Sequence, residues 1–540
     1  MEHMSPDQII IESARRVQRH FDLAQRFFAD TLMESGINVL RTFRSVRPQM
    51  MEIHDVLNNP VLHKALEAPE VSAMADRERA HAEALREAVA LEKGVSRALR
   101  FSEESFRRRG LVMFGFVQDA ENFDQVTSRA ERFQKLLATL SINPARERRK
   151  IDLHFEACSY RQHLEDVFAN QRAIAHVRMK NAPGVYASPY ASLCASYGGL
   201  FAPFDDAATV DALFEQVTQQ RHAQLELQSI TVPNLPEISF ETGQQIIDRL
   251  NRHFGIDLDQ VRLAKGLPSM AMGGRENAVA IVRFEPDPLT LIETYVHEAL
   301  GHILYRNNLP DDSDHPLFGM INGFQVDETL ALWCERTWLR DPNVLAEVAK
   351  LVSDIIPLNP EDLAVRVQLI QPVPKDRTSA DNLSYMIKEL IRGRAERDII
   401  NGDMEVRDLP ARLEQDYLHA FGLEICGFDM LRQTFQWPLC LQGHTASYPQ
   451  GMVLAAQMDK VIRADLSADA YSDLSGGADC PALSWLRDAI HSKGKTLPPD
   501  VMMAAALGGP LDIACYLEQI NVAADKKRAL HLSEAPAREL

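Results

Sequence analysis

Two histidines and two glutamates in the middle of the chain have the residue types and spacing of a zinc site. His297, Glu298 and His302 stand in the run His-Glu-Ala-Leu-Gly-His, and Glu328 follows thirty-one residues after the first histidine. In the common zinc-peptidase helix, two histidines four residues apart bind the metal and a glutamate beside the first acts as general base. The combination therefore predicts metal-dependent hydrolysis.

The spacing of the histidines sets a condition on the helix that carries them. His297 and His302 are five residues apart, and a regular α-helix with about 100° per residue would separate their directions by roughly 140°. One inserted residue in a single π-type turn would restore a common face, and Gly301 is a suitable place for it. The sequence thus predicts either a π-bulged zinc helix or no metal site.

The surrounding residues favour the metal site. Residues 289–305 are largely apolar and predict a buried helix, and residues 325–339 predict a second one that carries Asp327, Glu328 and Glu335 among apolar side chains. An unpaired buried carboxylate is costly, so these groups need a partner, and a metal would serve. In the alternative reading, backbone carbonyls satisfy the histidines and the glutamates lie on a solvated helix face.

Composition and charge exclude several classes of protein. The 540 residues are 46% hydrophobic and 25% charged, which is typical of globular chains. The formal net charge of -18 argues against binding to nucleic acid or to an anionic membrane. We find no run near the roughly 18 apolar residues of a membrane span and no secretory signal at the amino terminus. A cytoplasmic protein is therefore expected.

The cysteines indicate a reducing compartment. Seven are scattered along the chain without paired spacing, so we expect free buried thiols and neither disulfides nor a thiolate zinc site.

The pattern of hydrophobic residues predicts a mainly α fold, which could form one large helical body. The expected helices other than the two above are residues 6–50, 61–145, 150–180, 204–228 and 240–254. Residues 278–284 form the one convincing β-favouring stretch, directly before the zinc helix. We expect this strand to lie at the edge of the active-site groove and to hold an extended peptide by main-chain pairing.

Five short segments, in the right order, resemble motifs of the carboxypeptidase Taq family. These segments are residues 188–193, 210–214, 376–381, 402–410 and 485–494. Members of that family are cytoplasmic zinc metallocarboxypeptidases that are almost wholly helical and usually homodimeric. The resemblance runs from about residue 90 to 520. It implies one large helical domain with a deep active-site groove over residues 90–525, an N-terminal helical extension over residues 1–90 and a charged tail over residues 526–540.

The resemblance also implies roles for the central residues. His297 and His302 correspond to the family's zinc-binding histidines, Glu328 to its third ligand, and Glu298 to the general base that activates a zinc-bound water. One Zn²⁺ per chain is implied, and other divalent metals are alternatives. The substrate would be a peptide or small amide, with no nucleic acid or membrane partner and with a second copy of the chain as homodimer partner.

Further candidates stand where the family has polar substrate-contacting motifs. Tyr448 lies in the position of a tyrosine-rich element, with His444 nearby, and both are candidates to stabilise the oxyanion. The substrate-binding candidates are Arg377, Arg283, Arg275 and Gln433. Arginine is the residue best suited to bind the free C-terminal carboxylate of a peptide, because it donates two parallel hydrogen bonds.

The chain departs from the family on the substrate side. Asn277, Val279 and Ile281 replace the family's Asp-x-Arg-x-Thr motif, and residues 433–437 lack the acid and the histidine of its Gln-Asp-x-His-Trp motif. Three functions are therefore considered. The first is a zinc carboxypeptidase, the second a zinc amide hydrolase or tailoring enzyme with a specialised substrate, and the third a non-catalytic protein that keeps the fold. Retention of Glu298 argues against the third.

Overall fold

The computed structural model describes most of the chain. The described residues are 4–35, 59–69, 160–181, 183–224, 233–265, 269–275, 277–310, 324–368, 381–424, 441–494 and 497–534, with the single positions 52, 56, 57, 71, 82, 85, 86, 89, 436 and 437. They are mainly helical with one small sheet, which confirms the expected fold class.

Contacts within the chain define two compact units, each built from several segments. The first unit comprises Met1–Leu200, Asp312–Ile321 and Ile391–Ala446, and the second comprises Phe201–Asp311, Asn322–Leu390 and Ser447–Leu540. The sequence predicted one large helical domain over residues 90–525. The boundaries expected at residues 90 and 525 stay predictions.

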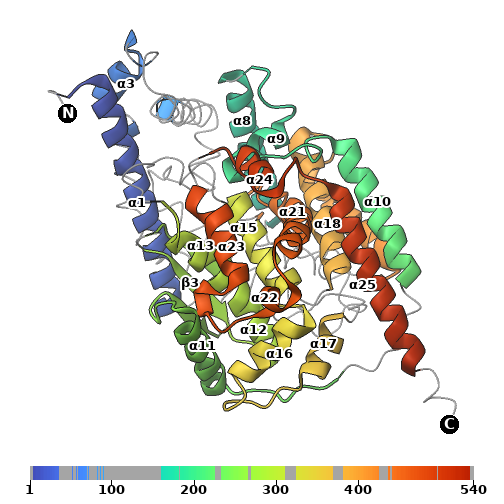
Figure 1. Cartoon of the computed structure of the whole chain (residues 1–540). Helices are drawn as coiled ribbons and strands as arrows, with labels where there is room; N and C mark the ends of the chain where they lie inside the picture. The colour runs from blue at the N-terminus through green and yellow to red at the C-terminus, as the bar shows by residue number, and fades with distance from the viewer. Residues whose placement is uncertain are drawn as a thin grey trace. The chain divides into compact units, whose positions relative to one another are not determined.

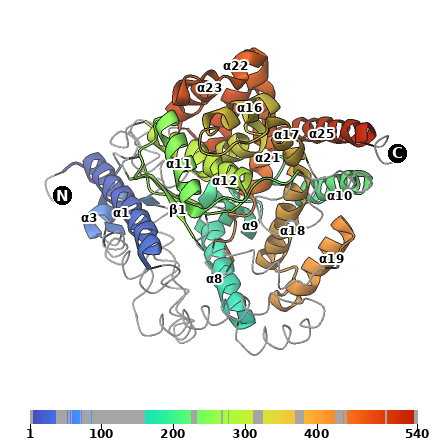
Figure 2. The ribbon, with the colours of Figure 1, turned by 90° about the horizontal axis from the view of Figure 1, so that it is seen from below.

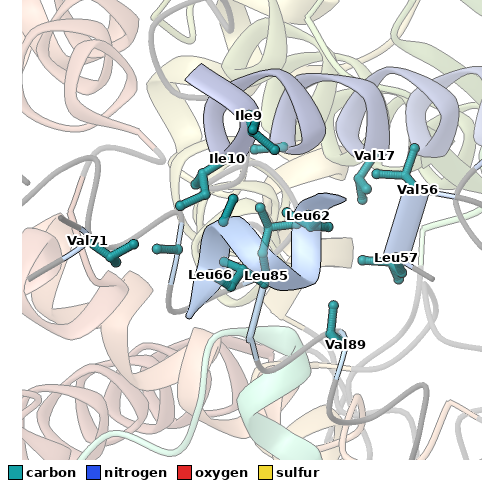
Figure 3. Packing of buried hydrophobic residues seen from close by; sticks show 13 residues of the cluster. Ile9, Ile10, Val17, Val56, Leu57, Leu62, Leu66, Val71, Leu85 and Val89 are labelled. Atoms are coloured by element: carbon teal, nitrogen blue, oxygen red, sulfur yellow. The ribbon is translucent and has the colours of Figure 1, made fainter. Parts of the chain in front are cut away.

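The first unit contains a small hydrophobic core near the amino terminus. The helices of this unit are α1 (Pro6–Ser35), α3 (Pro60–Leu66), α8 (Tyr160–Asn181), α9 (Pro189–Cys194) and α19 (Leu409–Phe421), with the 3₁₀ turns η2 (Ala195–Tyr197) and η6 (Val406–Asp408). Ile10 and Val17 of α1 pack with Leu62 and Leu66 of α3 (Figure 3). Helix α3 is much shorter than the predicted helix over residues 61–145, most of which lies outside the described residues.

The second unit holds the remaining helices. They are α10 (Ala207–Gln224), α11 (Phe240–Phe254), α12 (Pro288–Tyr295), α13 (Leu304–Asn307), α15 (Phe324–Trp333), α16 (Pro342–Leu351), α17 (Pro360–Gln368), α21 (Ser447–Asp465), α22 (Ala468–Ser472), α23 (Pro481–Ala489), α24 (Pro499–Leu507) and α25 (Ile513–Glu534), with the 3₁₀ turns η7 (Gly477–Asp479) and η8 (His491–Lys493). Helix α18 (Asn382–Asn401) contributes residues to both units.

Helix α15 lies in the core of the second unit. It packs against α21, and the two run side by side (Figure 1). Its Leu330, Leu332 and Trp333 are fully buried, and the Trp333 ring stacks on Trp338 at a centroid distance of 5.7 Å. Because α15 is covered on several sides, its carboxylates cannot lie on a solvated face, which removes the alternative reading of Glu328.

A three-stranded sheet supports the helix that carries the two histidines. Its strands are β1 (Val261–Ala264), β2 (Met270–Met272) and β3 (Val279–Arg283), in the order β1-β3-β2. β3 is parallel to β1 and antiparallel to β2. The strand predicted at residues 278–284 is therefore central, and the expectation that it pairs with a peptide is wrong because both its edges are occupied. Figure 2 shows β1 and α12 beside α11.

The histidine helix runs from Pro288 to Asn307 with a π-helical middle. Asp287 begins it, because its side chain accepts a hydrogen bond from the Thr290 N–H at 2.9 Å and Pro288 follows at a position that needs no donor. The π stretch η4 covers Val296–Ile303, and the Leu304 N–H bonds back five residues to the Ala299 carbonyl. The predicted π-type turn is confirmed.

A second π stretch, which the sequence did not predict, follows α15. This stretch, η5 (Cys334–Trp338), ends with a hydrogen bond from the Leu339 N–H to the Cys334 carbonyl at 3.0 Å. It packs against η4, so two π-helical stretches face each other in the second unit. Neither histidine spacing nor a glycine marks η5 in the sequence.

Two expectations from composition can be compared with the described residues. There, no helix combines the length and apolar character needed to cross a bilayer. Cys194, Cys334 and Cys480 are buried free thiols and Cys515 is a partly exposed one. The other three cysteines lie outside the described part of the chain.

Candidate metal centre

Gly301 allows the histidine helix to cross α15 at very short range. A Cβ atom at this position would lie 2.3 Å from the Cα atom and 2.5 Å from the Cβ atom of Ala331. Only a residue without a side chain fits against that backbone. The close crossing brings the π stretch η4 directly onto the helix that carries Glu328.

The two predicted histidines and Glu328 converge on one point. The Nε2 atoms of His297 and His302 are 3.3 Å apart. Each of these atoms lies 3.8 Å from a carboxylate oxygen of Glu328. All three side chains are buried, with at most 5% of each exposed.

These separations fit a single bound metal ion. Two metal–nitrogen bonds of about 2.0–2.1 Å at a tetrahedral angle span about 3.3 Å. A nitrogen and an oxygen that bind the same ion are at most about 4.2 Å apart, which the distances to Glu328 satisfy. Two imidazoles and one carboxylate are one of the ligand sets of catalytic zinc sites, which keep a fourth position open for water.

Glu298 lies beside this group of ligands. It places a carboxylate oxygen within 4.8 Å of ligand atoms of both His297 and His302, and it is buried. Glu328 on α15 also approaches both Nε2 atoms, at 3.8 Å, so either carboxylate could complete the ligand set. The resemblance to the family implies that Glu328 takes this place and leaves Glu298 as the base.

The Nδ1 atom of each histidine ring contacts a buried carboxylate. The Nδ1 atom of His302 is 2.9 Å from Asp327, whose other oxygen accepts a hydrogen bond from Arg306 at 2.6 Å. The Nδ1 atom of His297 is 2.8 Å from Glu335, whose other oxygen lies 3.1 Å from its sequence neighbour Arg336. With Nδ1 engaged in this way, Nε2 of each ring faces the centre.

The electrostatics of the centre favour a cation. Burial alone would lower the pKa of His302, but the nearby carboxylates of Asp327, Glu298 and Glu328 raise it. Burial would raise the pKa of Asp327, but Arg306 and His302 hold it well below its usual range. Around the centre, four carboxylates face two guanidinium groups, so two negative charges remain when the imidazoles are neutral. A divalent ion would balance them.

Tyr448 lies where α21 crosses the first turn of α15. The carbonyl of the preceding residue, Ser447, accepts a hydrogen bond from Gln325 at 3.2 Å, one turn before Glu328 on α15. The Tyr448 side chain is buried, and its ring meets that of Tyr385 edge-on at 6.4 Å. Its predicted role as an oxyanion donor stays a prediction.

Three other sequence candidates lie in the first unit or outside the described residues. His444 is buried in the first unit, where its ring packs edge-on against Tyr197 at 5.3 Å. Arg377 and Gln433 lie outside the described residues. Their roles and that of His444 stay predictions.

Arg283 and Arg275 are found near the sheet that supports the histidine helix. Arg283 ends β3 and forms an ion pair with Glu285. Arg275 is exposed and lies two residues after Gly273, whose carbonyl accepts a hydrogen bond from Arg306 at 3.2 Å. The same guanidinium holds Asp327, so Arg275 belongs to a loop tied to the metal centre.

The sequence identified the central residues but missed their supports. Asp327 and Glu335 stood out as carboxylates on an apolar helix, yet a metal was the only partner considered for them. Arg306 and Arg336 were not singled out. The available clue was that they stand close to apolar residues such as Tyr305 and Trp338, where a charge needs a partner.

The comparison with protein families covers most of the chain. The sequence model of the carboxypeptidase Taq (M32) metallopeptidase family matches residues 116–523. This chain belongs to that family. Metallopeptidases are hydrolases that use a divalent metal, and the residues gathered around Glu328 are suited to hold one. The resemblance predicted from short motifs is confirmed, including its extent to about residue 520.

Curated carboxypeptidases are similar to this chain in sequence, and solved carboxypeptidase structures are similar to it in fold. Carboxypeptidase 1 of Bacillus subtilis is 23% identical over 343 residues, which cover 60% of this chain and 68% of that protein. Thermostable carboxypeptidase 1 of Pyrococcus furiosus is 24% identical over 239 residues, or 47% of its length. The fold is similar to those of a Pyrococcus furiosus carboxypeptidase (TM-score 0.74, 17% identity, 97% of this chain and 99% of that one) and of Trypanosoma cruzi metallocarboxypeptidase 1 (TM-score 0.73, 17% identity, 96% and 99%).

Proposed function

We propose that this protein is a zinc-dependent carboxypeptidase that hydrolyses the C-terminal amide bond of a peptide. The observation that carries the proposal is the pair of Nε2 atoms 3.3 Å apart, each 3.8 Å from Glu328. This set is buried in a chain of a metallopeptidase family. His297, His302 and Glu328 would hold one zinc ion per chain.

The residues around the ligands have distinct tasks. A zinc ion held there would lower the pKa of a water towards about 7 and polarise the scissile carbonyl. Glu298 accepts the proton of the attacking water and passes it to the leaving amine. Tyr448 donates a hydrogen bond to the oxygen on which negative charge develops. The buried surroundings exclude bulk water and strengthen these interactions.

The carboxylate of the substrate needs a cation, and the structure favours some candidates over others. Arg283 already pairs with Glu285, so binding substrate would break an existing ion pair. Arg275 is exposed and lies in the loop that Arg306 ties to the metal centre. We therefore favour Arg275 over Arg283, with Arg377 as the third candidate and Gln433 as a neutral substrate contact.

The direct test of the function is the variant Glu298→Gln. The amide has the size of the carboxylate but cannot accept the proton. We expect about one zinc per chain in both proteins, and release of C-terminal residues by the wild type only, with turnover in the variant reduced by about 10²-fold or more. Normal hydrolysis by the variant would refute the role of Glu298. Absence of zinc from the wild type would refute the metal site.

A second candidate function is hydrolysis of a specialised amide that lacks a standard peptide terminus. Two of the positions that carry polar side chains in the family, Val279 and Ile281, are buried apolar residues of the central strand β3. Hydrolysis of a panel of N-blocked dipeptides distinguishes the two functions. Broad release of C-terminal residues supports the carboxypeptidase, and no release from a zinc-loaded protein supports the specialised hydrolase.

Two further properties rest on the resemblance to the family. We propose that the protein forms a homodimer and acts in the cytoplasm, with peptides as substrates. Size-exclusion chromatography with light scattering measures the mass directly, and a mass equal to one 60.7 kDa chain would contradict the dimer.

A further inference from the structure

Two buried chains of contacts lead to the two histidines, and their carboxylates lie on α15 and on the π stretch η5 that follows it. One consists of Arg306, Asp327 and His302, and the other of Arg336, Glu335 and His297. In each, one carboxylate oxygen lies 2.8 or 2.9 Å from the imidazole Nδ1 atom, and the other oxygen forms an ion pair with the guanidinium group. All of these groups are at most 10% exposed in their side chains.

We propose that Asp327 and Glu335 are positioning residues that hold both imidazoles with the proton on Nδ1. A carboxylate is an acceptor only, so a neutral imidazole beside it must place its single N–H there. The unprotonated Nε2 atom is then left facing the metal. This arrangement goes beyond the ligand set and rests on the metal site of the proposed function.

The arginines have their own part in this arrangement. Arg306 donates to Asp327 at 2.6 Å and to the Gly273 carbonyl at 3.2 Å, so it fixes the carboxylate to the loop before β3. A carboxylate held by a guanidinium stays ionised and cannot turn away from the ring.

On the other side, Arg336 stacks over the Tyr385 ring at 3.8 Å. Tyr385 in turn contacts Tyr448 edge-on. The contacts that position His297 therefore extend to the candidate oxyanion donor.

The two π-helical stretches explain why the chains of contacts come in a pair. The stretch η4 turns both histidines toward one centre, and η5 carries both Glu335 and Arg336. η4 and η5 pack against each other, while Asp327 precedes the third ligand Glu328 on α15. The packing of η4 on α15 and η5 therefore places the proposed ligands and their positioning carboxylates side by side.

The test is the zinc affinity of Asp327→Ala and Glu335→Ala, measured in the full chain by competition with a chelating dye. We expect each variant to bind zinc about 10- to 100-fold more weakly, because removal of such partners releases the ring. The visible spectrum of the Co²⁺-loaded protein should change as well, since it reports the geometry of the ligands. Wild-type affinity in both folded variants would overturn the proposal.

Conservative variants keep the test decisive if the alanine variants do not fold. Asp327→Asn and Glu335→Gln retain an oxygen that can accept the Nδ1 proton but lose the charge held by arginine. We expect a smaller loss of zinc affinity than in the alanine variants, and no loss at all would contradict the role of the arginines. Asp381→Asn is the matched control, because Asp381 is equally buried in the same unit and pairs with Lys527 at 3.2 Å. It should leave zinc affinity unchanged.

Failure of this inference and failure of the proposed function give different results. A wild type that binds zinc but releases no C-terminal residue would contradict the function, and weakened zinc binding in the variants would still support the positioning role. Variants with wild-type zinc affinity and full peptide hydrolysis would contradict the positioning role and leave the proposed function intact.

Discussion

At the residue scale, the metal centre depends on how each buried polar group is satisfied. His297 and His302 have one ring nitrogen toward a carboxylate and the other toward the centre. Burial of so many ionisable groups would be costly if any of them lacked a partner. The arginines supply two positive charges, and a divalent ion would supply the charge that is still needed.

Glu396 is a buried carboxyl group of the first unit that the proposed chemistry does not use. It accepts hydrogen bonds from the Trp437 ring N–H at 2.6 Å, the Gly443 N–H at 2.7 Å and the Thr445 hydroxyl at 3.1 Å. Burial nevertheless raises its pKa from 4.5 to about 7. The folded chain thus holds a proton on Glu396 between pH 4.5 and 7 that the unfolded chain has released.

This shift predicts a loss of stability as the pH rises through that window, because the folded state binds the extra proton. We expect the unfolding free energy of the wild type, relative to Glu396→Gln, to fall by about 2–3 kcal/mol between pH 5 and pH 8. Denaturant titrations of both proteins at the two pH values measure this difference. A difference independent of pH would show that Glu396 is ionised throughout.

Much of the residue-scale site could be predicted because histidines and glutamates at close spacing are informative. The positioning partners could not, because Arg306 and Asp327 are twenty-one residues apart and meet only when η4 packs on α15. Sequence spacing alone does not show which arginine faces which carboxylate.

At the scale of elements, the crossing of η4 over α15 determines the geometry of the centre. The five-residue spacing of the histidines predicted the π turn, since a regular helix would turn them apart. The role of β3 was harder to predict. A β-favouring run shows that a strand forms, but its pairing on both edges depends on two short strands that come earlier in the chain.

Substitution of Gly301 tests this crossing. Gly301→Ala would place a methyl group 2.3 Å from the Ala331 Cα atom, and backbone cannot move away cheaply. We expect a loss of about 1–3 kcal/mol or more in unfolding free energy, together with weaker zinc binding.

Gly451→Ala is the matched control, because Gly451 lies on α21, which also packs against α15. Its added methyl group would meet the end of the Leu332 side chain at 2.8 Å, which can rotate, and the next atoms are 3.6 Å away. We expect a smaller loss of stability and unchanged zinc affinity. Equal effects of the two substitutions, measured by denaturant titration and chelator competition, would show that the short crossing is not essential.

At the scale of the whole molecule, the proposed metal chemistry belongs to one of the two units. His297, Glu298, His302 and Glu328, together with their positioning carboxylates, all lie in the second unit. This unit therefore contains all three proposed ligands and the proposed base. The first unit has its own N-terminal hydrophobic core (Figure 3) and the buried carboxyl group of Glu396.

The most direct test of this account is a crystal structure of the zinc-loaded protein with anomalous diffraction recorded at the zinc absorption edge. We predict one anomalous peak per chain, at about 2.0–2.2 Å from the Nε2 atoms of His297 and His302 and from an oxygen of Glu328. The Nδ1 atoms should remain on Asp327 and Glu335. A zinc-loaded crystal with no peak at this point, or with the peak on other residues, would contradict the account.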